Sequence, residues 1–166
     1  AATRMAELTI TYRDSALSVH HGEHRHGTAR AGDHAPDPVG LFRPESTPVA
    51  IEELLTRPGL LLLTRTADSG TAEQLRRVLG DLGTVVRIVR NAGAAVDDDG
   101  DRVIDPDDVV GREYGLGREG VALIRPDGYL GLVADAADPD LVRRYLGDVL
   151  RITGVPGRRP TVASHR

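Results

Sequence analysis

The stretch Leu60-Leu61-Leu62-Leu63-Thr64 is an uninterrupted apolar run that follows the turn-forming pair Pro58-Gly59. A short run of this kind next to turn signals is typical of a strand that is covered on both faces of a sheet. Thr71-Ala72-Glu73-Gln74 then has the pattern of a capping box, which predicts a helix that stops at Gly83 in a left-handed conformation. Residues 85–89 form the next apolar run and predict a second strand.

Further elements are predicted downstream of this strand–helix–strand unit. An acidic loop leads to Asp105-Pro106, which is expected to cap a short helix. Residues 121–124 predict a strand, and Arg125-Pro126-Asp127-Gly128 has the composition of a tight turn. Residues 129–133 are expected to return as the antiparallel partner of that strand. Asp138-Pro139 then begins a last helix, whose apolar residues recur at helical spacing up to residue 150.

The part of the chain before Leu60 is less regular. Residues 8–12 alternate between apolar and polar and predict a short strand. Residues 14–48 are rich in Gly, Pro, His and Ser, which indicates a linker or an extended wrapping segment. Pro48 is expected to open a short helix. The predicted division is an N-terminal strand and linker at 1–47, a folded domain at 48–153 and a flexible tail at 154–166.

From Leu60 onward the predicted order is β-α-β-α-β-β-α, which is the order of the thioredoxin fold. This α/β architecture is a mixed four-stranded sheet with helices on both faces, whose first two strands are joined by a right-handed crossover. Here an N-terminal extended segment precedes it. The length of 166 residues fits one such domain with short tails.

Composition excludes several classes of function. The net charge of −4 argues against nucleic acid as the main partner, and all 21 basic residues are arginine. The cysteine count is zero, which excludes disulfides, thiolate metal sites, cysteine nucleophiles and dithiol redox chemistry in this chain. No apolar run approaches the roughly 18 residues that a membrane span needs. A cytoplasmic protein with no membrane partner is therefore expected.

The position of a thioredoxin active site, between the first core strand and its helix, falls at residues 66–71. It has no cysteine, and no proline immediately precedes Val121, where redox thioredoxins keep a cis-proline. Free N–H groups at the helix start, near Ser69 and Thr71, could bind a small anion. The preferred interpretation is that Ser69 or Thr71 only caps the helix.

Three other patterns resemble sites. Gly115-Leu116-Gly117-Arg118-Glu119-Gly120 has the letters of a dinucleotide fingerprint, but a helix precedes it and a strand follows, which favours a helix cap and turn. Asp97-Asp98-Asp99-Gly100-Asp101 is rich in aspartate, yet a calcium loop aligned on Gly100 would place Ala95 and Pro106 at ligand positions, so a solvated turn is expected. The imidazole cluster could capture a metal, although a solvated linker is the preferred interpretation. Its members are His20, His21, His24 and His26, with Glu23 nearby.

The residues therefore predict no catalytic, cofactor-binding or metal-binding group in this chain. There is also no nucleophile elbow of the G-x-S-x-G type.

Three segments in order are similar to signatures of a known family. They are residues 12–18 (YRDSALS), residues 31–37 (AGDHAPD) and residues 120–129 (GVALIRPDGY). Together they resemble the C-terminal region of FAD-dependent aromatic hydroxylases, a group that includes phenol hydroxylases and polyketide-tailoring oxygenases. The resemblance runs from about residue 7 to residue 150. The chain departs from the family at Ala16, His34 and Gly131-Leu132.

The resemblance implies a redox-silent, thioredoxin-like structural or dimerisation domain of a larger monooxygenase. FAD and NAD(P)H would serve that parent enzyme, whose FAD-binding and substrate domains would be the partners of this chain, with a homodimer possible. Two alternatives stay open. One is a stand-alone thioredoxin-like module that binds a partner protein or a small anion, and the other is an independent enzyme that uses the histidine cluster and a metal.

Overall fold

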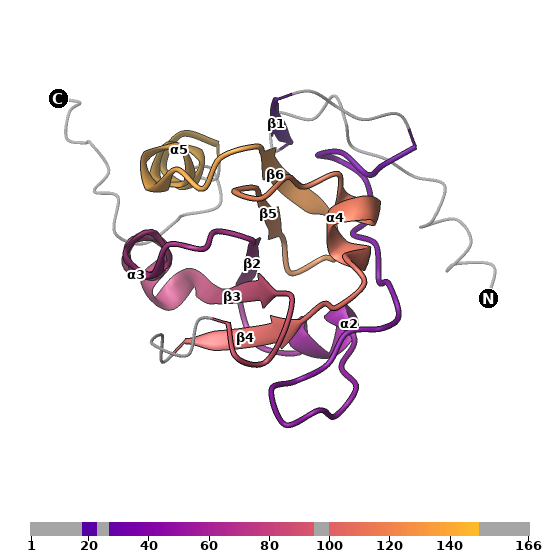
Figure 1. The fold of residues 1–166 in the computed structure, drawn as a ribbon. Coiled ribbons are helices and arrows are strands. Elements are labelled where there is room, and N and C mark those ends of the chain that lie inside the picture. The colour runs from indigo at the N-terminus through magenta and orange to yellow at the C-terminus, as the bar shows by residue number, and fades with distance from the viewer. Residues whose placement is uncertain (1–17, 23–26, 95–99, 150–166) are drawn as a thin grey trace, which may run out of the picture.

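The computed structural model describes residues 18–22, 27–94 and 100–149, which form one six-stranded sheet with helices on both sides (Figure 1). The strand order is β1-β6-β5-β2-β3-β4. The strands are β1 (Val19–His21), β2 (Leu60–Thr64), β3 (Gly83–Val89), β4 (Asp101–Ile104), β5 (Val121–Ile124) and β6 (Leu130–Ala134). The helices are α2 (Ile51–Leu54), α3 (Ser69–Leu79), α4 (Val109–Tyr114) and α5 (Pro139–Arg144), with a 3₁₀ turn at Gly80–Leu82 and a π-helical turn at Tyr145–Val149.

The predicted thioredoxin-like arrangement is confirmed in its central strands. β2 and β3 are parallel, with Leu62 opposite Val85. β5 runs antiparallel to β2 on the other side, and β6 is the antiparallel partner of β5. The turn between β5 and β6 forms as predicted, because the N–H of Gly128 donates to the carbonyl of Arg125 at 2.8 Å.

The sheet has six strands, so the prediction of four was wrong at both edges. β4 lies where an acidic loop was expected and pairs in parallel with β3. β1 lies in the segment interpreted as linker or wrapping chain, and pairs in parallel with β6. Each is only three or four residues long. Such short strands take their hydrogen bonds from an existing sheet edge, and their own sequence has little propensity signal to reveal them.

The leucine run of β2 separates two hydrophobic cores. Leu61 and Leu63 face one core together with α2 and α4, whereas Leu60 and Leu62 face the other together with α3 and α5. Figure 1 shows these helix pairs on opposite sides of the sheet. All five residues of β2 are buried, which confirms the prediction of a strand covered on both faces.

Residues 27–49 form a wrapping segment and not a detached linker. Ala31, Leu41 and Val49 are buried in the same core as Leu63. The N–H of Gly32 donates to the carbonyl of Leu130 at 2.8 Å, which ties the segment to β6. The predicted strand at 8–12 and the tail at 154–166 lie outside the described residues, and the division at residues 47 and 153 stays a prediction.

The ends of α3 differ from the prediction. The N-cap is Asp68, whose carboxylate accepts the N–H of Thr71 at 2.8 Å, so the helix begins at Ser69 and not at Thr71. The helix ends at Gly80, which has φ +53°, whereas Gly83 is extended. Gly83 is needed for a different reason: a Cβ there would lie 2.0 Å from the carbonyl oxygen of Leu60. Close approach of β3 to β2 therefore requires glycine at this position.

The start of α2 is fixed by a residue far from it in sequence. Pro48 was expected to open this helix, which instead begins at Ile51. The carboxylate of Asp37 accepts the N–H of Ile51 at 2.8 Å. This contact joins the wrapping segment to the helix and could not be found from local capping patterns.

Alkaline pH is expected to destabilise the fold through two buried tyrosines. Burial raises the pKa of Tyr145 to about 12 and that of Tyr114 still further above its ordinary value of 10. The unfolded chain then loses these protons at a lower pH than the folded chain, so the contribution of the two tyrosines to stability is constant well below pH 10 and falls above it. The expected slope is about 1.4 kcal/mol per pH unit for each tyrosine.

Urea titrations between pH 8 and pH 11.5 would measure this slope. Because the chain has no lysine and arginine stays protonated, few other groups titrate in that window. The hydroxyl of Tyr114 donates to the carbonyl of Pro36, so Tyr114→Phe should cost about 1 kcal/mol at pH 8 and should also flatten the alkaline slope. An unchanged slope in this variant would contradict the assignment.

Within the described ranges, no helix is long and apolar enough to span a membrane.

Candidate functional site

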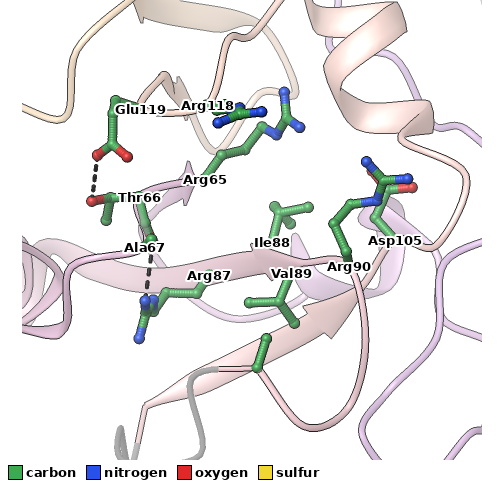
Figure 2. Close-up of a pocket in the computed structure, with 11 residues that line it drawn as sticks. Arg65, Thr66, Ala67, Arg87, Ile88, Val89, Arg90, Asp105, Arg118 and Glu119 are labelled. Atoms are coloured by element: carbon green, nitrogen blue, oxygen red, sulfur yellow. Dashed lines mark hydrogen bonds between the residues drawn. The ribbon is translucent and has the colours of Figure 1, made fainter.

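A cavity of about 500 Å³ opens where β2 and β3 end and where β5 begins (Figure 2). In open α/β sheets, ligands bind outside the carboxyl ends of the strands. The loop after β2, at residues 65–67, forms one wall, so the cavity adjoins the position where sequence analysis placed the thioredoxin active site. The lining residues are Arg65, Thr66, Ala67, Arg87, Ile88, Val89, Arg90, Ala94, Asp105, Arg118 and Glu119.

The start of α3 is not an open anion site, because the chain's own carboxylate occupies it. Asp68 accepts both the hydroxyl of Thr71, at 2.6 Å, and its N–H. These hydrogen bonds hold the pKa of Asp68 below its ordinary value, so the carboxylate is ionised at neutral pH. The structure therefore contradicts capping by Ser69 or Thr71, and it removes the helix start as the place for a small anion.

Two arginines of the cavity are held by the fold. Arg87 is only 1% exposed, and its Nη2 donates to the carbonyl of Thr66 at 3.0 Å. Arg65 has a side chain that is 13% exposed, lies 2.8 Å from a carboxylate oxygen of Asp108 and donates to the carbonyl of Leu116. Because both side chains are nearly immobilised, their guanidinium groups have fixed positions beside the cavity.

The other two arginines are exposed. Arg90 donates from Nη2 to the carbonyl of Pro106 at 3.0 Å, which leaves its remaining donors toward solvent. Arg118 lies in the loop before β5. Among residues 18–22, 27–94 and 100–149, neither side chain forms an ion pair with a carboxylate, so their charges are not neutralised by a direct partner.

The two carboxylates of the cavity are engaged by neutral donors. Asp105 is 1% exposed and accepts the N–H groups of Val109 and Val110 at 2.8 and 2.9 Å. Its carboxylate thereby satisfies the first N–H groups of α4, but the N-cap position is Asp108 and not Asp105 as predicted. Glu119 accepts the hydroxyl of Thr66 at 2.7 Å. Four arginines and two carboxylates line the cavity, and Asp108, which lies outside the lining, forms an ion pair with Arg65.

The sequence-based reasoning did not find this arginine cluster. Its four members are separated by up to 53 positions in the chain, and no motif connects them. One signal was present: Arg87 interrupts the apolar strand Val85-Val86-Arg87-Ile88-Val89, and an arginine inside a buried strand is rarely tolerated without a specific partner.

Residues 115–120, whose sequence resembles a dinucleotide fingerprint, form a helix end and a turn, as predicted. Gly115 has φ +69° and ends α4, and its N–H donates to the carbonyl of Gly111. The N–H of Gly120 donates to the carbonyl of Gly117 just before β5. Arg118 and Glu119, which lie inside this pattern, instead contribute side chains to the cavity.

The other candidate patterns are only partly described. His20 and His21 lie on β1, and a ring nitrogen of His20 accepts the N–H of Ala31 at 3.4 Å. Glu23, His24 and His26 lie outside the described residues, as do residues 97–99 of the acidic stretch. In the part of the chain that the structure describes, no three His, Asp or Glu side chains are grouped as metal ligands. The metal hypothesis for the histidine cluster therefore stays untested.

The fold and the cysteine-free loop after β2 define a thioredoxin-like domain without the dithiol of redox thioredoxins. The solved structure of a thiol peroxidase from Chromobacterium violaceum superposes with a TM-score of 0.54 and 16% identity, over 78% of this chain and 95% of the peroxidase. At this identity the similarity shows the fold alone.

No family model matches the chain. It is 35% identical over 130 residues to 6-methylpretetramide 4-monooxygenase of Streptomyces rimosus, and the match covers 76% of this chain and 22% of the monooxygenase. The structure of an aklavinone-11 hydroxylase, solved with FAD and aklavinone, superposes with a TM-score of 0.61 and 21% identity over 81% of this chain and 25% of the hydroxylase. The chain is related to a C-terminal fragment of FAD-dependent hydroxylases, and it spans about a fifth to a quarter of their length.

Proposed function

We propose that this chain is the non-catalytic C-terminal domain of an FAD- and NAD(P)H-dependent monooxygenase that hydroxylates an aromatic or polyketide substrate. In the parent enzyme the flavin supplies the oxygen chemistry. The domain stabilises the assembly by packing against the FAD-binding and substrate domains. Its own residues take no part in electron transfer.

The observation that carries this proposal is the 35% identity to a monooxygenase over most of the chain. It is combined with the lack of cysteine in the loop after β2, where redox thioredoxins have their active site. The loop at residues 65–68 follows β2 as in a thioredoxin fold. It offers the hydroxyl of Thr66, but that group already donates to Glu119. No nucleophile or redox group is poised there, which supports a structural role.

The character of the surface favours packing between domains over an obligate homodimer. Among the described residues, Val39 is the one large apolar side chain that is strongly exposed, at 87%. Obligate dimer interfaces resemble a hydrophobic core cut in half, whereas interfaces between domains of one chain are more polar. The partner surface proposed here is therefore polar, and dimerisation is the second possibility.

The first test is the length of the native reading frame upstream of Ala1. We expect a product several times longer than this chain, with a strand–G-x-G-x-x-G–helix unit near its start. The second test substitutes Thr66→Ala and Ser69→Ala in that full-length enzyme. Hydroxylation rate and flavin absorbance should both stay unchanged, because neither residue takes part in chemistry. Loss of hydroxylation with FAD still bound would show a catalytic role and would overturn the proposal.

A second function is favoured by one specific observation, the cavity lined by four arginines. A native product no longer than this chain would point to a stand-alone thioredoxin-like module. In that case the cavity, and not the start of α3, is where a small anion or an acidic partner segment would bind.

A further inference from the structure

We propose that one edge of the sheet, where the chain comes into the described fold, binds the preceding part of the parent enzyme. We call this surface the N-terminal edge and define it as Ser18, strand β1 (Val19–His21) and residues 28–33. Its occupant is a segment of the FAD-binding or substrate portion of the same polypeptide, so this interface rests on the proposed function. The contact is made by hydrogen bonds to the side chains of Ser18 and Arg30.

Two buried polar atoms of the N-terminal edge have no hydrogen-bond partner. Within the described ranges, neither the hydroxyl oxygen of Ser18 nor the Nε of Arg30 is hydrogen-bonded. Proteins rarely leave buried polar groups unsatisfied, so each such atom requires an explanation. A partner outside this chain that accepts from Arg30 and pairs with the hydroxyl of Ser18 would supply one. The other buried atoms of this kind belong to residues that have a further interaction, namely Arg76, Arg87, Arg102, Asp108 and Arg125.

Ser18 and Arg30 belong to neighbouring segments of the fold. A ring nitrogen of His20 accepts the N–H of Ala31 at 3.4 Å, which joins β1 to the wrapping segment. Ser18 directly precedes β1, and Arg30 directly precedes Ala31. β1 is also the terminal strand of the sheet, and no described strand pairs with its outer side. The outer side of an edge strand offers backbone groups to a second segment. The same surface therefore has an open strand edge and two unsatisfied side-chain atoms.

Arg30 determines the chemistry that the occupant must provide. Its side chain forms no ion pair with any described residue, although the residue is half-buried. The carboxylate of Asp33 accepts the backbone N–H of Arg30 at 3.0 Å, a contact that does not involve the guanidinium group. A carboxylate or a carbonyl oxygen is the natural acceptor for a guanidinium N–H, and charge-assisted hydrogen bonds are the stronger ones. The matching surface of the occupant therefore has an oxygen acceptor opposite Arg30.

The order of the polypeptide favours the preceding part of the parent enzyme as the occupant. This chain is related to a C-terminal fragment of hydroxylases that are several times longer. In a parent of that kind the remaining polypeptide comes first and reaches the described fold at Ser18. A covalently linked segment has a high effective concentration near its point of attachment, so a few polar contacts are enough to hold it there.

Hydrogen exchange of the full-length enzyme and of the 166-residue chain tests this interface. Backbone N–H groups of residues 18–22 and 28–33 should exchange about tenfold more slowly in the full-length enzyme, because the occupant covers them. Residues 43–47 are the internal control, since they follow Phe42 beside β4, at the other end of the sheet (Figure 1). Equal rates at the N-terminal edge in the two proteins, or equal slowing at residues 43–47, would overturn the inference.

Substitutions in both proteins test the two side chains. Arg30→Gln and Ser18→Ala should each speed exchange at the N-terminal edge by about threefold in the full-length enzyme. They should leave the rates of the 166-residue chain unchanged, because the partners of both side chains belong to the longer protein. Arg77→Gln is the matched control: its side chain is 74% exposed on α3, and the substitution should alter neither protein at this edge. Equal effects in the two proteins would place the partners within this chain and would overturn the inference.

Failure of this interface and failure of the proposed function give different results. A native reading frame no longer than this chain would remove the occupant and would overturn both. A longer product that hydroxylates its substrate, but has the same exchange rates at the N-terminal edge as the 166-residue chain, would overturn only the interface. Protection of the edge that rises with the concentration of the 166-residue chain would show a second copy as the occupant, and would overturn the assigned partner.

Discussion

Replacement of Asp105 by alanine is expected to lower the free energy of unfolding by about 3 kcal/mol. The side chain is 1% exposed, and its two oxygens accept the N–H groups of Val109 and Val110 at the start of α4. Its own N–H donates to the carbonyl of Val89 at 2.7 Å. The residue thus links the end of β3 to α4, and alanine would leave two buried N–H groups without an acceptor.

Asp105→Asn is the matched variant, because asparagine keeps the shape of the side chain and one carbonyl acceptor. It should lose about half as much stability as Asp105→Ala. Urea unfolding at pH 7, followed by circular dichroism, measures both. If alanine prevents folding altogether, the asparagine variant still gives a value. A loss below about 0.5 kcal/mol in both, which is the range of ordinary surface substitutions, would contradict the capping role.

The second large effect is expected at the leucine run of β2. Leu62 and Leu63 are adjacent and fully buried, but they face different cores. Leu62→Ala and Leu63→Ala should each cost about 3 kcal/mol, from lost burial together with the cavity that remains. Since both sheet faces are covered, the two losses should be of similar size.

Val39→Ala is the control for this pair. Val39 is apolar but 87% exposed, so its truncation should change the free energy of unfolding by less than about 0.5 kcal/mol. Urea unfolding of the three variants gives these free energies, when all curves are fitted with the same dependence of unfolding free energy on urea concentration. A loss confined to one of the two leucines would mean that one face of β2 is not packed as the structure shows.

Much of the fold was predictable because it depends on local periodicity. The run at residues 60–64, the helix after it and the apolar residues 121–124 and 129–133 each have the pattern of one element. The ends of helices were less predictable, because several polar residues compete for the same N–H groups. At α3, Asp68 accepts the N–H of Thr71, so the threonine that resembled the cap became the donor.

The two edge strands could not be predicted in the same way. β1 and β4 are short, and their residues match no strand pattern strongly. They are strands because β6 and β3 offer unpaired backbone groups beside them. The wrapping segment is a similar case, since the contacts of Asp37 with Ile51 and of Gly32 with Leu130 join residues 14 to 98 positions apart.

By itself the sequence determined the order of the central elements and excluded thiol chemistry, because apolar spacing and the cysteine count need no knowledge of contacts. Its short motifs also indicated the hydroxylase relationship. Only the tertiary structure decided the sheet edges, the residue that caps α3 and the grouping of arginines around one cavity. Arg65, Arg87 and Arg118 come from separate elements, and they line one cavity only after β2 has paired with both β3 and β5. Which charged side chains surround a site depends on their positions in space. Strand pairing sets these positions, and the order of residues in the chain does not.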